Sequence, residues 1–224
     1  MDWRALEVSL ALAFWTIALL IPLATLLARW LAWGQFRGRT LVGALVALPL
    51  VLPPTVLGFY LLDAVGGGSL LGELYRTVTG GSLAFSFQGL VVASLLFNLP
   101  FAVLPIERAF ETIPQNVREA AWVSGLSNWQ TFWRIEGPLA WPGFASALAL
   151  VFAHSLGEFG VVLMVGGNVP GETRTASVAI YDQVQAFETA AAGRMSLVLL
   201  ALCCIAMVVV NWTSRAARTA RHDQ

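Results

Sequence analysis

Long apolar stretches separated by short polar segments dominate this sequence. Crossing about 30 Å of hydrocarbon takes about 20 apolar residues in an α-helix. Five stretches reach or approach that length: about 8–28, 41–62, 89–106, 139–165 and 195–213. The third is short, and the preceding residues 85–88 would lengthen it. The pattern predicts an all-α, polytopic transmembrane helical bundle, with residues 1–224 as a single domain.

A sixth segment, residues 175–192, is too polar for a lipid-exposed span. Its apolar positions Val178, Tyr181, Val184 and Phe187 recur at every third residue. That spacing suits an amphipathic or re-entrant helix packed on the bundle.

Composition supports a membrane protein. Hydrophobic residues make up 58% of the chain and charged residues 12%, about half the share in soluble domains. The formal net charge is zero, which argues against a nucleic-acid binder. The apolar N-terminal stretch exceeds a usual signal-peptide core and predicts a retained helix. Cys203 and Cys204 are adjacent in an apolar run and are interpreted as small apolar residues. No motif indicates a metal or cofactor site.

The arginines orient the predicted spans. Nine of the thirteen lie in three regions on one side: Arg29, Arg37 and Arg39; Arg108, Arg118 and Arg134; and Arg215, Arg218 and Arg221. The other side holds Arg4, Arg76, Arg174 and Arg194. Because cytoplasmic loops carry the excess of basic residues, the C-terminus and the loop 107–138 are predicted to be cytoplasmic and the N-terminus external.

Three prolines interrupt the second predicted span, at Pro49, Pro53 and Pro54. Each removes a backbone donor and would kink or break a helix. Such an interruption is tolerated in a membrane where neighbouring helices or a water-filled cavity satisfy the freed carbonyls. The segment is either a simple packing kink or a broken helix that lines a pathway.

The cytoplasmic loop predicts two short helices joined by a glycine. The first begins near Gln115 or Asn116, and Gly125 is suited to end it in the left-handed conformation. A second helix follows with Ser127 or Asn128 as its cap, and Pro138 opens the next span. This elbow would lie either in a groove of a partner protein or at the lipid headgroups.

The same loop resembles the cytoplasmic "EAA" loop of type I ABC importer permeases. The matching positions are Glu119, Ala120, Ala121, Gly125, Ile135 and Pro138, while Gly137 stands where that family usually has leucine. The resemblance implies a type I permease fold whose coupling loop, about 111–138, docks in a cleft of an ATP-hydrolysing subunit.

Three further segments, 48–62, 153–175 and 177–185, resemble permeases of molybdate importers. The "GEFG" at 157–160 is shared with sulfate, thiosulfate and tungstate relatives, and the "PGETRT" at 170–175 favours molybdate. The resemblance implies a homodimer in a bacterial inner membrane, two cytoplasmic ATPase subunits, an external molybdate-binding protein and no cofactor. The chain itself would not be an enzyme. Tungstate, sulfate or thiosulfate are alternative cargoes.

Polar residues in the fourth predicted span are pathway or gate candidates, because ionisable groups at membrane depth are costly. His154 and Glu158 would share a helical face, and an ion-coupled secondary transporter that uses them as a proton relay is the rival function. Glu158 would pair with His154, cap broken-helix amides, or support the gate and dimer interface. Substrate contact is expected instead from Ser155, Thr55 or amides near Gly157 and Gly160, beside Pro53 and Pro54.

The external segment 166–175 is rich in glycine and carries Asn168, Glu172, Thr173 and Arg174. It is either an ordinary loop or the docking surface for a soluble binding protein.

Overall fold

The computed structural model describes the backbone of residues 1–222 and the side chains of residues 1–210. Within that range every regular element is a helix, which confirms the predicted class. The elements are α1 (Trp3–Trp33), α2 (Arg39–Val51), α3 (Pro54–Val65), α4 (Leu70–Thr79), α5 (Phe87–Phe97), α6 (Leu99–Glu111) and α7 (Gln115–Val123). They continue with α8 (Asn128–Thr131), the π-helical turn η1 (Phe132–Glu136), α9 (Gly137–Gly157), α10 (Gly160–Gly166), α11 (Ala176–Gln185) and α12 (Thr189–His222).

Three continuous helical segments are long and apolar enough to cross a membrane: Trp3–Trp33, Asn128–Gly157 and Thr189–Val210. Two bent pairs raise the number to five if each pair is one span. The α2–α3 pair bends by 112° and the α5–α6 pair by 40°. Each of these helices or helix pairs overlaps one of the five predicted stretches. Five spans are therefore counted when each bent pair is taken as one span.

The fourth predicted stretch, 139–165, is not one helix. The α9 helix ends at Gly157, Glu158 is extended, and α10 begins at Gly160. The interruption falls within the "GEFG" segment. The apolar run continued across it, which is why hydropathy alone did not reveal the break.

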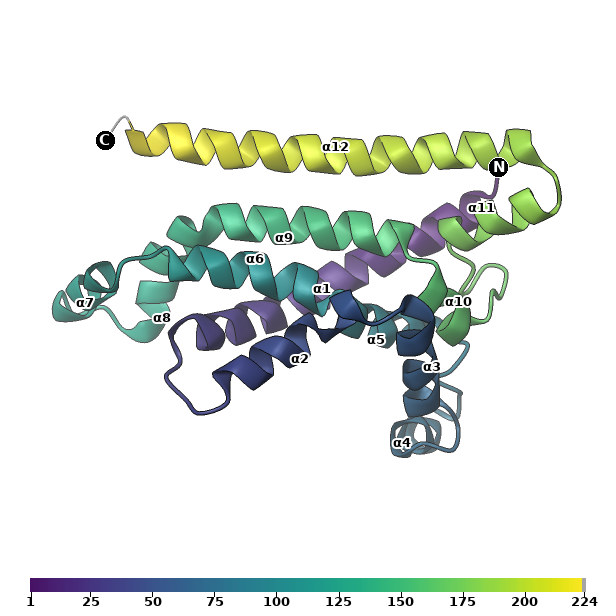
Figure 1. Cartoon of the computed structure of the whole chain (residues 1–224), viewed down its shortest axis with the longest axis horizontal. Helices are drawn as coiled ribbons and strands as arrows, with labels where there is room; N and C mark the ends of the chain where they lie inside the picture. The colour runs from purple at the N-terminus through teal and green to yellow at the C-terminus, as the bar shows by residue number, and fades with distance from the viewer. Residues whose placement is uncertain (223–224) are drawn as a thin grey trace.

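The packed centre is formed where α1, α6 and α9 meet, as Figure 1 shows along the long axis of the molecule. Many of its residues are small, including Ala24, Ala28, Ala102, Ala140 and Ala147, all of which are buried. Small side chains allow helix backbones to approach closely, which is the usual way helices associate in lipid. The α12 helix runs beside α9 on the outside of this centre.

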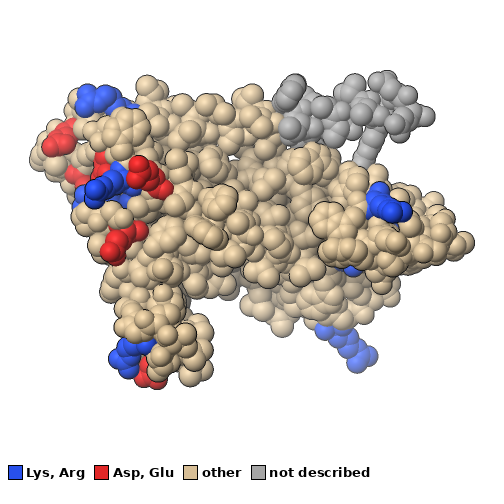
Figure 2. Space-filling view, turned by 180° about the vertical axis from the view of Figure 1, so that it is seen from behind, with Lys and Arg blue, Asp and Glu red and all other residues tan. Residues whose placement is uncertain are grey.

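Charged side chains gather toward the two ends of the molecule. On the face seen in Figure 2, a broad band without Lys, Arg, Asp or Glu separates these ends. The elements α7 and α8 lie at one end, and α4, α10 and α11 lie toward the other (Figure 1). The band is the surface expected to face lipid, because unpaired charge is costly there.

The segment 175–192 holds the short helix α11, but its buried face differs from the predicted one. Val178 is buried, whereas Tyr181, Val184 and Phe187 are exposed. Ala176 and Ala179 form the buried contact instead, against Ala5, Leu6 and Met195. A helix repeats every 3.6 residues, so a strict spacing of three drifts off the buried face.

Two other features lie outside the predicted scheme. The amphipathic helix α4 stands at the tip of the arm formed with α3, with Leu70, Leu74 and Val78 exposed, and the sequence reading missed it. The side chains of Arg215, Arg218 and Arg221, which contributed to the predicted orientation, lie outside the described residues.

Candidate functional site

The elbow at one end of the molecule is built by local chemistry. Pro114 precedes α7, which begins at Gln115 as predicted. Gly125 follows the helix with φ +83°, and its N–H donates to the Trp122 carbonyl while the Leu126 N–H donates to the Ala121 carbonyl. This pair of bonds is a Schellman motif, and a glycine there takes the left-handed conformation without a Cβ penalty.

The second arm of the elbow continues into the membrane helix. Ser127 caps α8 through a reciprocal capping box with Gln130. The chain then widens into the π turn η1, in which the Gly137 N–H bonds to the Phe132 carbonyl, and α9 follows directly. Pro138 therefore lies inside a continuous helix rather than opening a new one, because the wider turn accommodates a residue without an N–H.

The elbow presents an apolar and aromatic outer surface. Trp122, Val123, Trp129 and Trp133 are exposed, with Val123 at 90%. Glu119 and Ala120 are exposed beside them, whereas Ala121 is buried under the helix. Ile135 is half-buried and Pro138 exposed. An exposed cluster of this kind marks a contact surface.

Beneath the elbow lies an ionic cluster that the sequence analysis did not single out. The buried carboxylate of Glu136 accepts from Arg29 Nε at 2.7 Å, Arg29 Nη2 at 3.2 Å and Arg118 Nε at 3.1 Å. The Arg118 guanidinium also lies 3.5 Å from the centre of the Trp33 ring. The only available signal was that all three of these charged residues lie in predicted cytoplasmic loops.

A second candidate region joins two helix breaks. The α2–α3 break falls at Leu52 and Pro53, and the α9–α10 break at Glu158 and Phe159. These breaks touch: a Cβ on Gly160 would lie 3.0 Å from Pro54 Cβ. Thus the second span is broken rather than merely kinked, and glycine at position 160 is what lets α10 approach the start of α3.

His154 makes its hydrogen bond at a different helix junction, the one between α5 and α6. Its Nδ1 lies 2.9 Å from Asn98 Oδ1, at the junction of α5 and α6. The ring stacks near Phe97 and Phe101, with centroid distances of 4.7 and 4.1 Å. Asn98 also donates to Ser94, which accepts from Thr16. This buried chain holds α1, α5 and α9 together.

Glu158 does not pair with His154, contrary to the predicted pairing. Neither carboxylate oxygen of Glu158 has a hydrogen-bond partner among the described side chains and backbone, so it caps no helix amide either. The Glu158 side chain is buried, and so is Ser155 Oγ, which also has no partner in the described residues. Four residues apart on a helix brings two side chains to one face, but here α9 ends between them.

The loop 166–175 is held together by its own contacts and by contacts with α11. Arg174 Nε donates to Asn168 Oδ1 at 2.7 Å, and Asn168 Nδ2 donates to Asp182 Oδ2 at 2.9 Å, which fastens the loop to α11. Thr173 is fully buried and donates to the Gly166 carbonyl at 2.6 Å, so it does not lie on a docking surface. Of the four candidates, Glu172 is the exposed one.

Apart from His154, which bonds Asn98 at the α5–α6 junction, the candidates fall into three places. The elbow lies at one end and the 168–174 loop toward the other, as Figure 1 shows. The contact between the two helix breaks brings Pro54, Thr55 and Gly160 together. Gly157 borders open space.

Comparisons with known proteins identify the family and the fold of the chain. The family described as "Binding-protein-dependent transport system inner membrane component" matches residues 11–219. The chain is 49% identical to the molybdenum transport system permease protein of Azotobacter vinelandii over 85% of this chain and 84% of that protein. It is 28% identical to a sulfate transport system permease of Synechocystis over 99% of this chain and 80% of that protein. A solved chain of a bacterial alginate ABC transporter has the same fold, with a TM-score of 0.76, 20% identity, and coverage of 95% of this chain and 78% of that chain.

Proposed function

The chain belongs to the family of binding-protein-dependent transport system inner membrane components, and from this premise we propose that it is the membrane subunit of an ATP-driven molybdate importer. Its place is then the bacterial inner membrane. The assignment of molybdate as the cargo rests on sequence identity. The chain is 49% identical to a molybdenum permease across 85% of its length, but 28% identical to a sulfate permease.

The elbow supports an ATPase partner. Its rigid Schellman turn and exposed Trp122, Val123 and Trp129 suit a helix that docks in a groove of another protein. Glu119, Ala120 and Gly125 would form the contact and its bend, with Ile135 and Pro138 supporting the second arm. Two cytoplasmic ATPase subunits would close on ATP binding and move these elbows as rigid bodies.

The two helix breaks support a translocation route at a dimer axis. Pro53, Pro54 and Thr55 are exposed in the single chain, at the point where α2 turns by 112° into α3. A second copy related by two-fold symmetry would place these segments opposite one another. Free backbone groups at the broken helices, Thr55 and the region of Gly157 and Gly160 would then meet the oxyanion.

The opposite end of the chain would receive the binding protein. Glu172 is exposed there, and Arg174 and Asn168 shape the loop through their contacts with Asp182. In this orientation the N-terminus is external and the C-terminus cytoplasmic. ATP hydrolysis belongs to the partner, and this chain supplies the route.

Two rivals differ in their predictions. Tungstate or sulfate transport is the alternative within the class, because these dianions resemble molybdate in shape and charge. A proton-coupled secondary transporter is the alternative from another class. The contact of His154 with Asn98, rather than with Glu158, gives that relay no support.

Reconstitution into proteoliposomes tests the proposal. The chain is combined with its ATPase subunit and its binding protein, and uptake of labelled molybdate is measured with unlabelled molybdate, tungstate or sulfate as competitor. We expect uptake only with ATP and both partners, and stronger competition by molybdate or tungstate than by sulfate. Uptake driven by a proton gradient without the ATPase would contradict it.

A further inference from the structure

We propose that Glu136 and Arg118 are positioning residues that join the coupling helix α7 to the membrane helices. The inference rests on the proposed function and names the contact through which movement of α7 would reach α1, α6 and α9. The three charged residues of the ionic cluster beneath the elbow come from separate elements: Arg29 from α1, Arg118 from α7 and Glu136 from η1.

The buried position of Glu136 makes this a rigid contact. Its side chain is 0% exposed, and the side chain of Arg118 is 13% exposed. Both carboxylate oxygens are used: Oε2 accepts from Arg29 Nε at 2.7 Å, and Oε1 accepts from Arg118 Nε at 3.1 Å and from Arg29 Nη2 at 3.2 Å. A buried carboxylate with two guanidinium partners is held strongly in place, because each charge-assisted hydrogen bond fixes its position relative to one partner helix.

Little else attaches α7 to the bundle. Ala121 is the one residue of this helix that is buried, and the remainder of its length faces outward or is half-exposed. The Arg118 side chain reaches inward, stacks 3.5 Å from the Trp33 ring centre and bonds Glu136. It therefore contacts the end of α1 and the start of the α9 span at once.

The contact extends into the packed centre. Trp33 lies against Phe110 of α6, with ring centroids 5.1 Å apart, and Phe110 is fully buried in the cluster shared by α1, α6 and α9. A displacement of α7 would thus press on close-packed residues, which respond as units rather than by gradual deformation.

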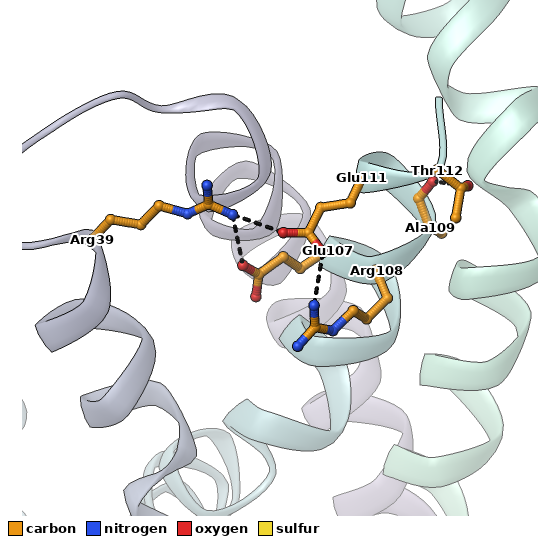
Figure 3. Close-up of polar contacts among 6 residues, drawn as sticks. All are labelled: Arg39, Glu107, Arg108, Ala109, Glu111 and Thr112. Atoms are coloured by element: carbon orange, nitrogen blue, oxygen red, sulfur yellow. Dashed lines mark hydrogen bonds and ion pairs between the residues drawn. The ribbon is translucent and has the colours of Figure 1, made fainter. Parts of the chain in front are cut away.

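A neighbouring ion pair provides a matched control. Figure 3 shows Arg39, at the start of α2, bonded to Glu111 at the end of α6. The Arg39 Nη2–Glu111 Oε1 distance is 2.7 Å, and Arg108 Nη1 lies 2.9 Å from Glu111 Oε2. Glu111 likewise binds two arginines at the elbow end of the molecule, but its partners lie on α2 and α6 and not on α7.

The test uses the complete complex with ATPase and binding protein in proteoliposomes. The variants are Arg118→Gln, Arg118→Lys, Glu136→Gln and the control Glu111→Gln. Arg118→Gln is the sharpest, because Glu136 keeps Arg29 and the buried charge stays compensated. The readout is the number of molybdate ions imported per ATP hydrolysed, together with the amount of assembled complex.

We expect Arg118→Gln to lower the imported molybdate per ATP by about tenfold with the complex still assembled, and Arg118→Lys to restore part of it. Glu111→Gln should stay within about twofold of the wild type. An unchanged ratio in Arg118→Gln, or an equal loss in Glu111→Gln, would overturn the inference even if Glu136→Gln fails to assemble. A wild-type complex that imports nothing with ATP would instead overturn the proposed function.

Discussion

The elbow and the pair of helix breaks both contain irregular backbone, but its causes differ. In the elbow, Gly125 and Ser127 supply the turn and the cap with their own neighbours. At the breaks, Pro53 and Glu158 interrupt helices that come together only because distant segments pack, with Gly160 against Pro54. The first kind of irregularity is a local property, and the second depends on the whole bundle.

The largest effect is expected from a substitution at Gly125, in the turn of the elbow. Gly125→Pro removes the N–H that bonds the Trp122 carbonyl and cannot adopt φ +83°, because proline holds φ near −65°. We expect molybdate uptake to fall by about a hundredfold while the chain still inserts in the membrane and the partner still hydrolyses ATP. The uptake and hydrolysis rates of the reconstituted complex measure this.

Gly125→Asn is the matched control, because asparagine tolerates the left-handed region. It should retain most uptake. Normal uptake in Gly125→Pro would remove the assignment of the elbow as the coupling element, as would equal losses in the two variants.

The contact between the breaks is tested at Gly160. Gly160→Leu places a side chain where a Cβ already lies 3.0 Å from Pro54, so α10 and α3 must separate. We expect uptake to fall by about tenfold with assembly preserved, since cores accept overpacking only at a cost of about 1–3 kcal/mol. Gly157→Ala adds a Cβ where nothing lies within 4 Å and keeps the backbone amides proposed to meet the oxyanion, so it should be tolerated. Similar losses in both variants would contradict the contact.

The buried polar chain around Asn98 should contribute to stability rather than to cargo choice. Asn98→Ala leaves His154 without its hydrogen-bond partner and removes one of the two bonds to Ser94 Oγ, at a cost of about 2–3 kcal/mol. Thermal unfolding in detergent measures this loss, with Thr16→Val, which removes only the outer bond, as the milder control. A double-mutant cycle should give coupling between Asn98 and His154 and less than about 0.5 kcal/mol between His154 and Glu158.

The smallest effect is expected at Glu158. Its buried carboxyl group has no hydrogen-bond partner among the described residues, so Glu158→Gln replaces it with an amide of similar size without breaking a bond. Stability should stay within about 1 kcal/mol of the wild type, since both side chains are polar groups buried without a partner there. The molybdate-to-sulfate preference should not change. An altered preference would make Glu158 part of the cargo site.

Several predictions from sequence hold because their causes are local. The start of α7, the glycine turn and the Ser127 cap each depend on residues within a few positions. The apolar stretches overlap the long helices because the length needed to cross lipid is a property of composition. The burial of α11 was predicted less well, because Tyr181 and Val184 are apolar but face outward.

Other features depend on contacts that no local pattern encodes. His154 and Glu158 share a predicted helical face, but α9 ends at Gly157, between the two residues. The hydrogen-bond partner of His154 is instead Asn98, at the α5–α6 junction. Thr173 reads as a loop surface residue but is buried against the Gly166 carbonyl.

The sequence by itself determined that this chain is an all-helical membrane protein, where its elbow bends, and which transport family it resembles. These follow from hydropathy, capping and spacing, which act over one helix turn or one span. Only the tertiary structure decided that Glu136 joins Arg29 and Arg118, that two broken helices touch, and which polar side chains remain unpaired. Those outcomes required residues separated by tens of positions to meet, and such meetings are set by the packing of the whole bundle.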